Sequence, residues 1–118
     1  MKSIIVKDLK KCINCGAVDG FKKIEVHHVI HGTSGRKLST QYHLVVGLCS
    51  ECHRGTYGVH GKMGTELDNK LKRIAQRYWE RKNGSRENFI SVFGKSYIIN
   101  DEYPQDESYK KERSDIFK

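Results

Sequence analysis

The 118-residue sequence is poor in apolar residues and lacks long hydrophobic runs. Hydrophobic residues make up 36% of the chain, a low share for a globular protein. Its apolar runs fall far short of the roughly 18 residues that indicate a membrane span. The N-terminal segment MKSIIVKDLKK breaks a short apolar stretch with charges, so we expect no secretory signal and a cytoplasmic location. A core this thin predicts one small domain that needs an additional cross-link.

Acidic residues are scarce over most of the chain. Lys and Arg number 22 against 14 Asp and Glu, which gives a net charge of +8. Residues 101–118 carry a net charge of −2, because they hold six acidic and four basic side chains, so residues 1–100 carry +10. A positive field of this size attracts polyanions, and nucleic acid is the first candidate partner. A solvated charged surface is the alternative. We expect residues 101–118 to form a polar, flexible tail.

Cysteines are few and occur only in pairs. All four lie in two Cys-x-x-Cys motifs, Cys12/Cys15 and Cys49/Cys52. In a reducing compartment such pairs favour metal binding over disulfides, and two of them supply the four thiolates of a tetrahedral structural zinc site. The 33 residues between Cys15 and Cys49 exceed the spacing of about 15–20 residues in a plain zinc site of this type. The sequence therefore predicts a functional insertion between the two pairs.

Histidines are confined to the middle of the chain. All six lie within 34 consecutive residues, at His27, His28, His31, His43, His53 and His60. Isolated surface histidines are the alternative interpretation, and for His31 it is the preferred one. For the group as a whole the clustering indicates a shared site. Histidine binds divalent metals through its neutral ring and exchanges protons near neutral pH.

Periodicity and turn residues predict an α+β chain with its helices toward the C-terminus. Glycines make 54–64 irregular after a helical turn that carries His53, and Thr65 and Ser85 are the expected helix caps. Gly94 is expected to end the last helix. The expected strands are 4–6, 21–30 and 42–48, the expected loop is 31–40, and the expected helices are 65–82 and 86–93.

The order of these motifs resembles a known family. The segments are Cys12-x-x-Cys15, Glu25-Val26-His27-His28-Val29 and His43-Leu44-Val45-Val46-Gly47-Leu48-Cys49-x-x-Cys52-His53. They resemble the zinc-knuckle members of the HNH endonucleases, which belong to the ββα-metal nucleases, over roughly residues 10–60. Residues beyond this core more loosely resemble small HNH proteins of bacteriophages and prophages. The resemblance implies a zinc-knuckle HNH core in residues 1–64, followed by a helical extension in 65–100 that packs on it.

The resemblance also implies a chemistry. The family hydrolyses DNA phosphodiester bonds with one divalent metal, which here would be Mg²⁺, Mn²⁺ or Zn²⁺. His28 matches the general base that activates water, while His27 and His53 match metal ligands. His43 matches the residue that orients the base, although its spacing from Cys49 is one residue longer than the family pattern. A surface role for His43 therefore stays open.

Further residues complete the predicted site. His60 follows His53 by seven residues, about two helical turns, so we expect a third metal ligand or a phosphate contact there. Arg36, Lys37 and Arg54 flank the predicted site and are candidates for phosphate binding. The alternative function is a non-catalytic zinc-knuckle protein that binds nucleic acid. It explains the charge and the cysteines but gives no role to the histidines.

Overall fold

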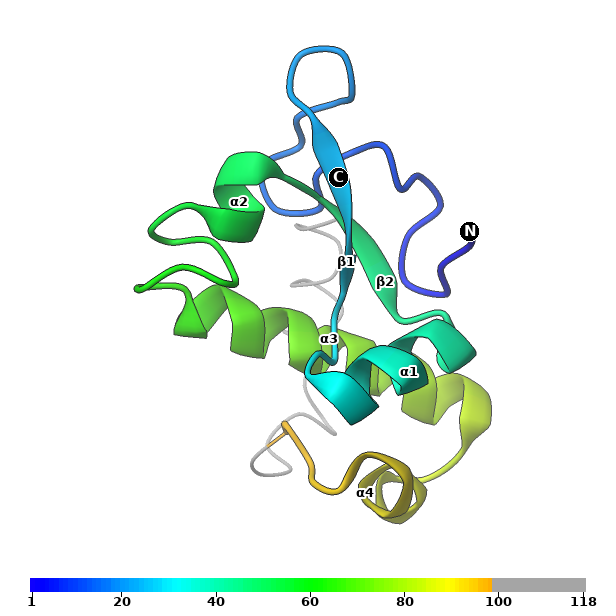
Figure 1. Ribbon diagram of the computed structural model, residues 1–118. Coiled ribbons are helices and arrows are strands. Elements are labelled where there is room, and N and C mark those ends of the chain that lie inside the picture. Colours follow the sequence, from blue (N-terminus) through cyan, green and yellow to red (C-terminus); the bar gives the residue numbers. More distant parts are fainter. Residues whose placement is uncertain (99–118) are drawn as a thin grey trace, which may run out of the picture.

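The computed structural model describes residues 1–98, and it combines a two-stranded sheet with helices (Figure 1). The predicted tail at 101–118 lies outside the described residues. Within 1–98 the elements, in chain order, are β1 (Ile24–His28), α1 (Thr33–Tyr42), β2 (Val45–Cys49), α2 (Ser50–Arg54), α3 (Thr65–Asn83) and α4 (Arg86–Phe93). The α+β class is confirmed. None of the described helices is long and apolar enough to cross a membrane.

The two strands form an antiparallel hairpin that organises the first half of the chain. Ile24 pairs with Cys49 and His28 pairs with Val45, so β1 runs alongside the full length of β2. All of β2 is buried, as expected for a β-branched apolar strand that lies between two layers. In Figure 1, α3 crosses behind this hairpin. Leu71 and Ile74 of α3 belong to the same buried cluster as the apolar side chains of β2.

The connection between the strands is a helix, and the prediction of a loop at 31–40 was wrong. Helix α1 spans Thr33–Tyr42, so the second strand begins at Val45 rather than at residue 42. Ser39 explains why a sequence rich in turn residues folds as a helix. Its buried hydroxyl donates to the carbonyl of Ile30 at 2.7 Å and accepts the Ile30 amide at 3.0 Å. This tertiary contact compensates for the weak helix propensity of the segment.

The N-terminal segment bends, and the predicted strand at 4–6 was also wrong. The Ser3 hydroxyl accepts the backbone amides of Ile5 at 2.9 Å and Val6 at 3.2 Å. It also donates to the carbonyl of Val45 at 2.6 Å. A serine that hydrogen-bonds the amides two and three residues ahead holds the backbone in a turn rather than a strand.

Both C-terminal helices form where the sequence predicted them. The buried stripe on α3 includes Leu71 and Ile74, and α4 buries Phe89 against Trp79. Ser85 caps α4 by accepting the Asn88 amide at 3.1 Å in a capping box, and Gly94 ends it with a positive φ of 93°. The predicted Thr65 cap was wrong. Gly64 precedes α3, Thr65 is its first helical residue, and no side-chain hydrogen bond caps this end within the described chain.

Candidate metal centres

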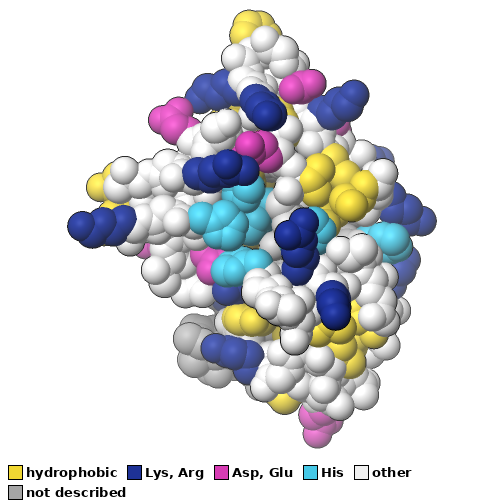
Figure 2. Space-filling view, viewed as in Figure 1, with side chains coloured by type: hydrophobic (Ala, Val, Ile, Leu, Met, Phe, Trp, Pro, Cys, Tyr) yellow, Lys and Arg dark blue, Asp and Glu magenta, His cyan; other side chains and the backbone are white. Residues whose placement is uncertain are grey.

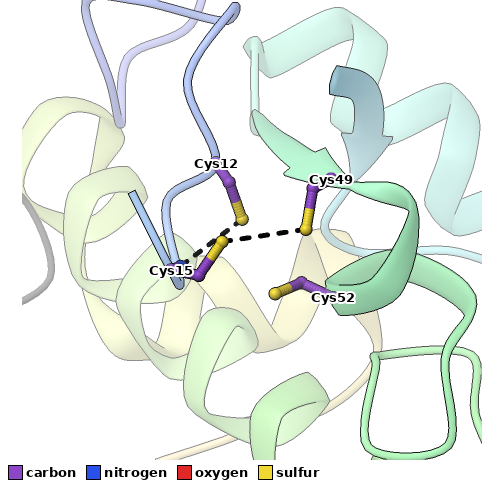
Figure 3. A group of neighbouring side chains, drawn as sticks. All are labelled: Cys12, Cys15, Cys49 and Cys52. Atoms are coloured by element: carbon purple, nitrogen blue, oxygen red, sulfur yellow. Dashed lines mark hydrogen bonds between the residues drawn. The ribbon is translucent and has the colours of Figure 1, made fainter. Parts of the chain in front are cut away.

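The four cysteines converge on one point, which we call the cysteine centre (Figure 3). Cys12 and Cys15 come from a turn near the N-terminus, Cys49 ends β2, and Cys52 lies in α2. Their sulfur atoms all lie within 4.8 Å of one another. Four sulfur atoms that can surround one ion tetrahedrally are the donor set of many structural zinc sites. The cysteine centre could therefore hold zinc, as the spacing predicted.

Close backbone packing brings the two cysteine pairs together. The Ile13 amide donates to the carbonyl of Gly47 at 2.9 Å, which joins the first pair to β2. A Cβ atom on Gly47 would lie 2.5 Å from the carbonyl oxygen of Leu9 and 2.6 Å from that of Lys11. Real Cβ atoms do not approach this closely, so only glycine permits the contact.

The environment of the cysteine centre separates the acidities of its thiols. Burial raises the pKa of Cys12, but hydrogen bonds from the amides of Cys15, Cys49 and Asn14 outweigh it and lower the value to about 7. At Cys52, burial and the neighbouring thiols raise the pKa to about 12, against a hydrogen bond from Asn14 that lowers it. The amide groups thus prepare one thiolate, and a bound cation would stabilise the others.

A second convergence involves His27, His53 and His60, which we call the histidine centre. One ring nitrogen of each lies within 4.8 Å of the others. The ring centroids are 5.1 Å apart for His27–His53 and His27–His60, and 4.8 Å apart for His53–His60. Figure 2 shows the histidines gathered near the middle of one face, with Lys and Arg side chains around them. His60 was a predicted ligand, although the helix on which its spacing argument relied does not extend past Arg54.

His27 is the most deeply buried member of the histidine centre, with only 2% of its surface exposed. Its Nε2 atom is buried without a hydrogen-bond partner among residues 1–98. A buried polar nitrogen left without a partner is unfavourable unless a ligand binds it. Burial, followed by the charges of His53, His60 and His31, lowers the pKa of His27 to about 3. The ring is therefore neutral at physiological pH, the state in which imidazole binds metals. These features fit a metal ion.

Glu25 orients His53 from the adjacent strand. Alternation along β1 places Glu25 on the same face as His27. The Nδ1–H of His53 donates to Glu25 Oε1 at 2.7 Å, which leaves Nε2 as the free ligand atom. This hydrogen bond is the main cause that lowers the pKa of Glu25, and Arg54, 3.3 Å from Oε2, adds to it. A carboxylate behind a histidine is the usual support of a metal ligand.

His60 reaches the centre through a tightly packed, glycine-rich turn. Its amide donates to the carbonyl of His53 at 2.9 Å, which fixes the two residues side by side. A Cβ atom on Gly61 would lie only 1.8 Å from the carbonyl oxygen of Gly55. Residues 55–64 are irregular as predicted, whereas Arg54 still belongs to α2. Their glycines let the chain fold back on itself and return His60 to His53 without a continuous helix.

The histidine centre forms part of a cavity of about 600 Å³. His28 also lines this cavity, and burial followed by the charge of Arg36 lowers its pKa. Arg36 and Arg54 line it as well, as expected for phosphate-binding residues. Lys37 instead lines a neighbouring cavity of about 540 Å³ that Arg36 shares.

His43 lies at the C-terminal end of α1. It does not line the cavity of the histidine centre but follows α1 in the left-handed conformation, with φ 61° and ψ 39°. Its carbonyl accepts the amide of Ile4 at 3.0 Å. The structure therefore gives His43 a place at the end of a helix rather than in the cavity.

Sequence reasoning missed three residues of this site. Glu25 supports His53, and the alternation of β1 could have revealed it. His31, interpreted as a surface residue, lines the cavity with its ring centroid 5.1 Å from that of His60 and 5.8 Å from that of His27. Its Nε2 atom hydrogen-bonds Asp68 Oδ1 at 3.0 Å. No local signal connects His31 with Asp68, because 37 residues separate them.

Comparisons with protein-family models, curated proteins and solved structures find no match to the chain.

Proposed function

We propose that the protein is a metal-dependent endonuclease of the HNH type that hydrolyses phosphodiester bonds in DNA. One observation carries the proposal. Three imidazoles converge within 4.8 Å at a cavity that is also lined by a further imidazole, His28, and by the guanidinium groups of Arg36 and Arg54. A metal site, a base and phosphate-binding cations in one cavity are the parts that phosphodiester hydrolysis requires.

The donor set favours a transition metal at the histidine centre. His27, His53 and His60 offer three neutral nitrogen ligands, which suit Zn²⁺ better than Mn²⁺ or Mg²⁺. Three protein ligands leave a coordination position for substrate, whereas the four cysteines form a closed, structural set. A divalent metal bound there would supply Lewis-acid chemistry, by polarising the scissile phosphate and stabilising charge on the leaving 3′ oxygen.

We assign the role of general base to His28. His27 and His28 both line the cavity but differ in exposure: His27 is buried, whereas His28 at the end of β1 is only partly covered. Because burial and Arg36 lower the pKa of His28, its ring is neutral at pH 7 and able to take a proton. In the proposed reaction it accepts the proton of the attacking water while the new P–O bond forms.

Basic side chains supply the remaining contacts to substrate. Arg36 and Arg54 face the cavity, and Lys37 extends the positive surface beyond it. Such cations neutralise phosphates without reading bases, so we expect binding that is strongly salt-dependent and weakly sequence-specific. The net charge of +8 favours the same class of partner.

A plasmid-nicking assay tests the proposal. Supercoiled DNA is incubated with the protein and Mg²⁺, Mn²⁺ or Zn²⁺, next to His28→Ala and, as a matched histidine control, His43→Ala. We expect the wild type to nick the plasmid, His28→Ala to lose on the order of 100-fold or more of the rate, and His43→Ala to retain it. Undiminished nicking by His28→Ala contradicts the mechanism. Salt-dependent binding of DNA without cleavage under any metal supports the non-catalytic alternative instead.

A further inference from the structure

Two histidine–carboxylate pairs meet at the same cavity. His53 donates to Glu25 across 2.7 Å, and His31 pairs with Asp68 across 3.0 Å. Both histidines line the cavity. The first pair supports a ligand of the histidine centre, and the second repeats its chemistry. An ionised carboxylate only accepts hydrogen bonds, so Nε2 of His31 carries a proton, and Nδ1 is the atom that has a free lone pair when the ring is neutral.

Asp68 is a fixed anchor for the His31 ring. It lies in the first turn of α3, and its side chain is only 14% exposed. Its second oxygen, Oδ2, pairs with the ammonium group of Lys72 at 2.9 Å, one helical turn further on. The carboxylate is therefore held in place on α3, beside His31. Metal-ligating histidines almost always donate their second ring N–H to such a group.

His31 lies near the histidine centre but outside the group of converging nitrogens. Its ring centroid lies 5.1 Å from that of His60 and 5.8 Å from that of His27, against 4.8–5.1 Å among the three converging rings. The group of nitrogens within 4.8 Å of one another nevertheless omits His31. Coordination by His31 therefore requires its ring to move closer to the other three.

We propose that His31 is a fourth, exchangeable ligand of the metal at the histidine centre, positioned by Asp68. The inference rests on the proposed function, since it assumes a metal held by His27, His53 and His60. Four imidazoles make a closed site of the structural kind, whereas three leave a position open. Coordination by His31 therefore defines a closed resting state, and a phosphate oxygen has to displace His31 to bind the metal.

Exchange between His31 and phosphate predicts two opposite effects when His31 is removed: weaker metal binding and tighter phosphate binding. Loss of His31 removes a ligand and weakens metal binding. It also removes the competitor of phosphate, so phosphate binds the metal-loaded variant more tightly than it binds the wild type. A residue with a merely structural role would weaken both. The sign of the phosphate effect thus separates a ligand from a structural residue.

The experiment titrates Co²⁺ into protein whose cysteine centre already holds zinc, and follows affinity and the visible Co²⁺ spectrum. We expect His31→Ala to bind the added metal at least tenfold more weakly with weaker visible absorption, and Asp68→Asn to bind it about 10- to 100-fold more weakly. His43→Ala, the same loss of a ring outside the cavity, should match the wild type. Inorganic phosphate is then titrated into each loaded protein, and His31→Ala should bind it more tightly than the wild type.

Each other outcome has a distinct meaning. Unchanged metal affinity and spectrum in His31→Ala, or weaker phosphate binding together with weaker metal binding, overturns the role of His31 alone. A wild type that takes up no metal beyond the cysteine centre overturns the proposed function as well. Circular dichroism and zinc content establish that each variant is folded. If His31→Ala does not fold, His31→Gln and Asp68→Asn give the same comparison.

Discussion

Acidification should destabilise the protein through His27 when the histidine centre holds no metal. The folded protein keeps this ring neutral because burial and neighbouring histidines lower its pKa to about 3, from an ordinary value of 6.5. The unfolded chain, with the ordinary pKa, binds a proton as the pH falls below 6.5. Between pH 6.5 and about 3 the unfolded state therefore binds more protons, and the free energy of unfolding falls with the pH.

The size of the effect follows from the two pKa values. At pH 7 both states leave the ring almost wholly neutral, so His27 contributes little to the pH dependence. At pH 5 the unfolded chain is protonated at this position while the folded protein is not. Because pH 5 lies one and a half pH units below the ordinary pKa, protonation stabilises the unfolded state and lowers the free energy of unfolding by about 2 kcal/mol.

Urea unfolding measures this loss, with the fluorescence of the single, buried Trp79 as the probe. The comparison is between the wild type and His27→Gln, each with zinc in the cysteine centre, at pH 7 and pH 5. Protonation of the thiols and of the other histidines affects both proteins. We therefore expect the wild type to lose about 2 kcal/mol more than His27→Gln between the two pH values. Equal losses in the two proteins would refute the reasoning, because they would mean that His27 titrates normally in the folded state.

Three further substitutions test how the two centres are held. Gly61→Ala places a Cβ atom against the carbonyl of Gly55, so we expect a loss of about 1–3 kcal/mol in urea unfolding and weaker metal binding at the histidine centre. Cys12→Ser removes a buried ligand of the cysteine centre, and because structural zinc contributes on the order of 10 kcal/mol to folding, we expect an unfolded, zinc-free protein by circular dichroism and zinc analysis. Glu25→Gln removes the carboxylate behind His53 and should weaken metal binding at the histidine centre about 10- to 100-fold in calorimetry, whereas unchanged affinity would contradict the support role.

The helices predicted correctly are those whose signals are local. Leu71 and Ile74 mark the buried face of α3, and Ser85 and Gly94 bound α4. Each of these signals lies within the helix that it marks or directly beside it. Helix α1 has no such signal. Its sequence favours turns, and it folds as a helix because Ser39 satisfies the backbone of Ile30 across the connection. A contact of this kind exists only once the tertiary structure has formed, so a scan of neighbouring residues does not find it.

The same distinction divides the candidate sites. The two cysteine pairs could be found from short spacings, because the members of each pair are three residues apart. His53 could be found in the same way, because it directly follows Cys52 in α2. His31 and Asp68 could not, since their contact depends on how the end of β1 packs beside the first turn of α3. His43 shows the converse. Its place in a motif predicted a role in the site, but the unpredicted α1 ends there and gives its backbone a structural position.

The histidine centre depends on the cysteine centre through α2. This helix has five residues, too few to be stable in isolation, and it carries a ligand of each centre in succession, Cys52 and then His53. Zinc in the cysteine centre would hold Cys52 against the N-terminal turn, and the position of His53 follows from that. His60 depends in turn on His53, whose carbonyl binds its amide. The order of dependence therefore runs from the cysteine centre to the histidine centre. Zinc bound by the four cysteines, of which Cys12 and Cys49 are buried and Cys15 is exposed, would stabilise the short helix. The proposed exchange of ligands at the histidine centre could then occur without loss of the fold.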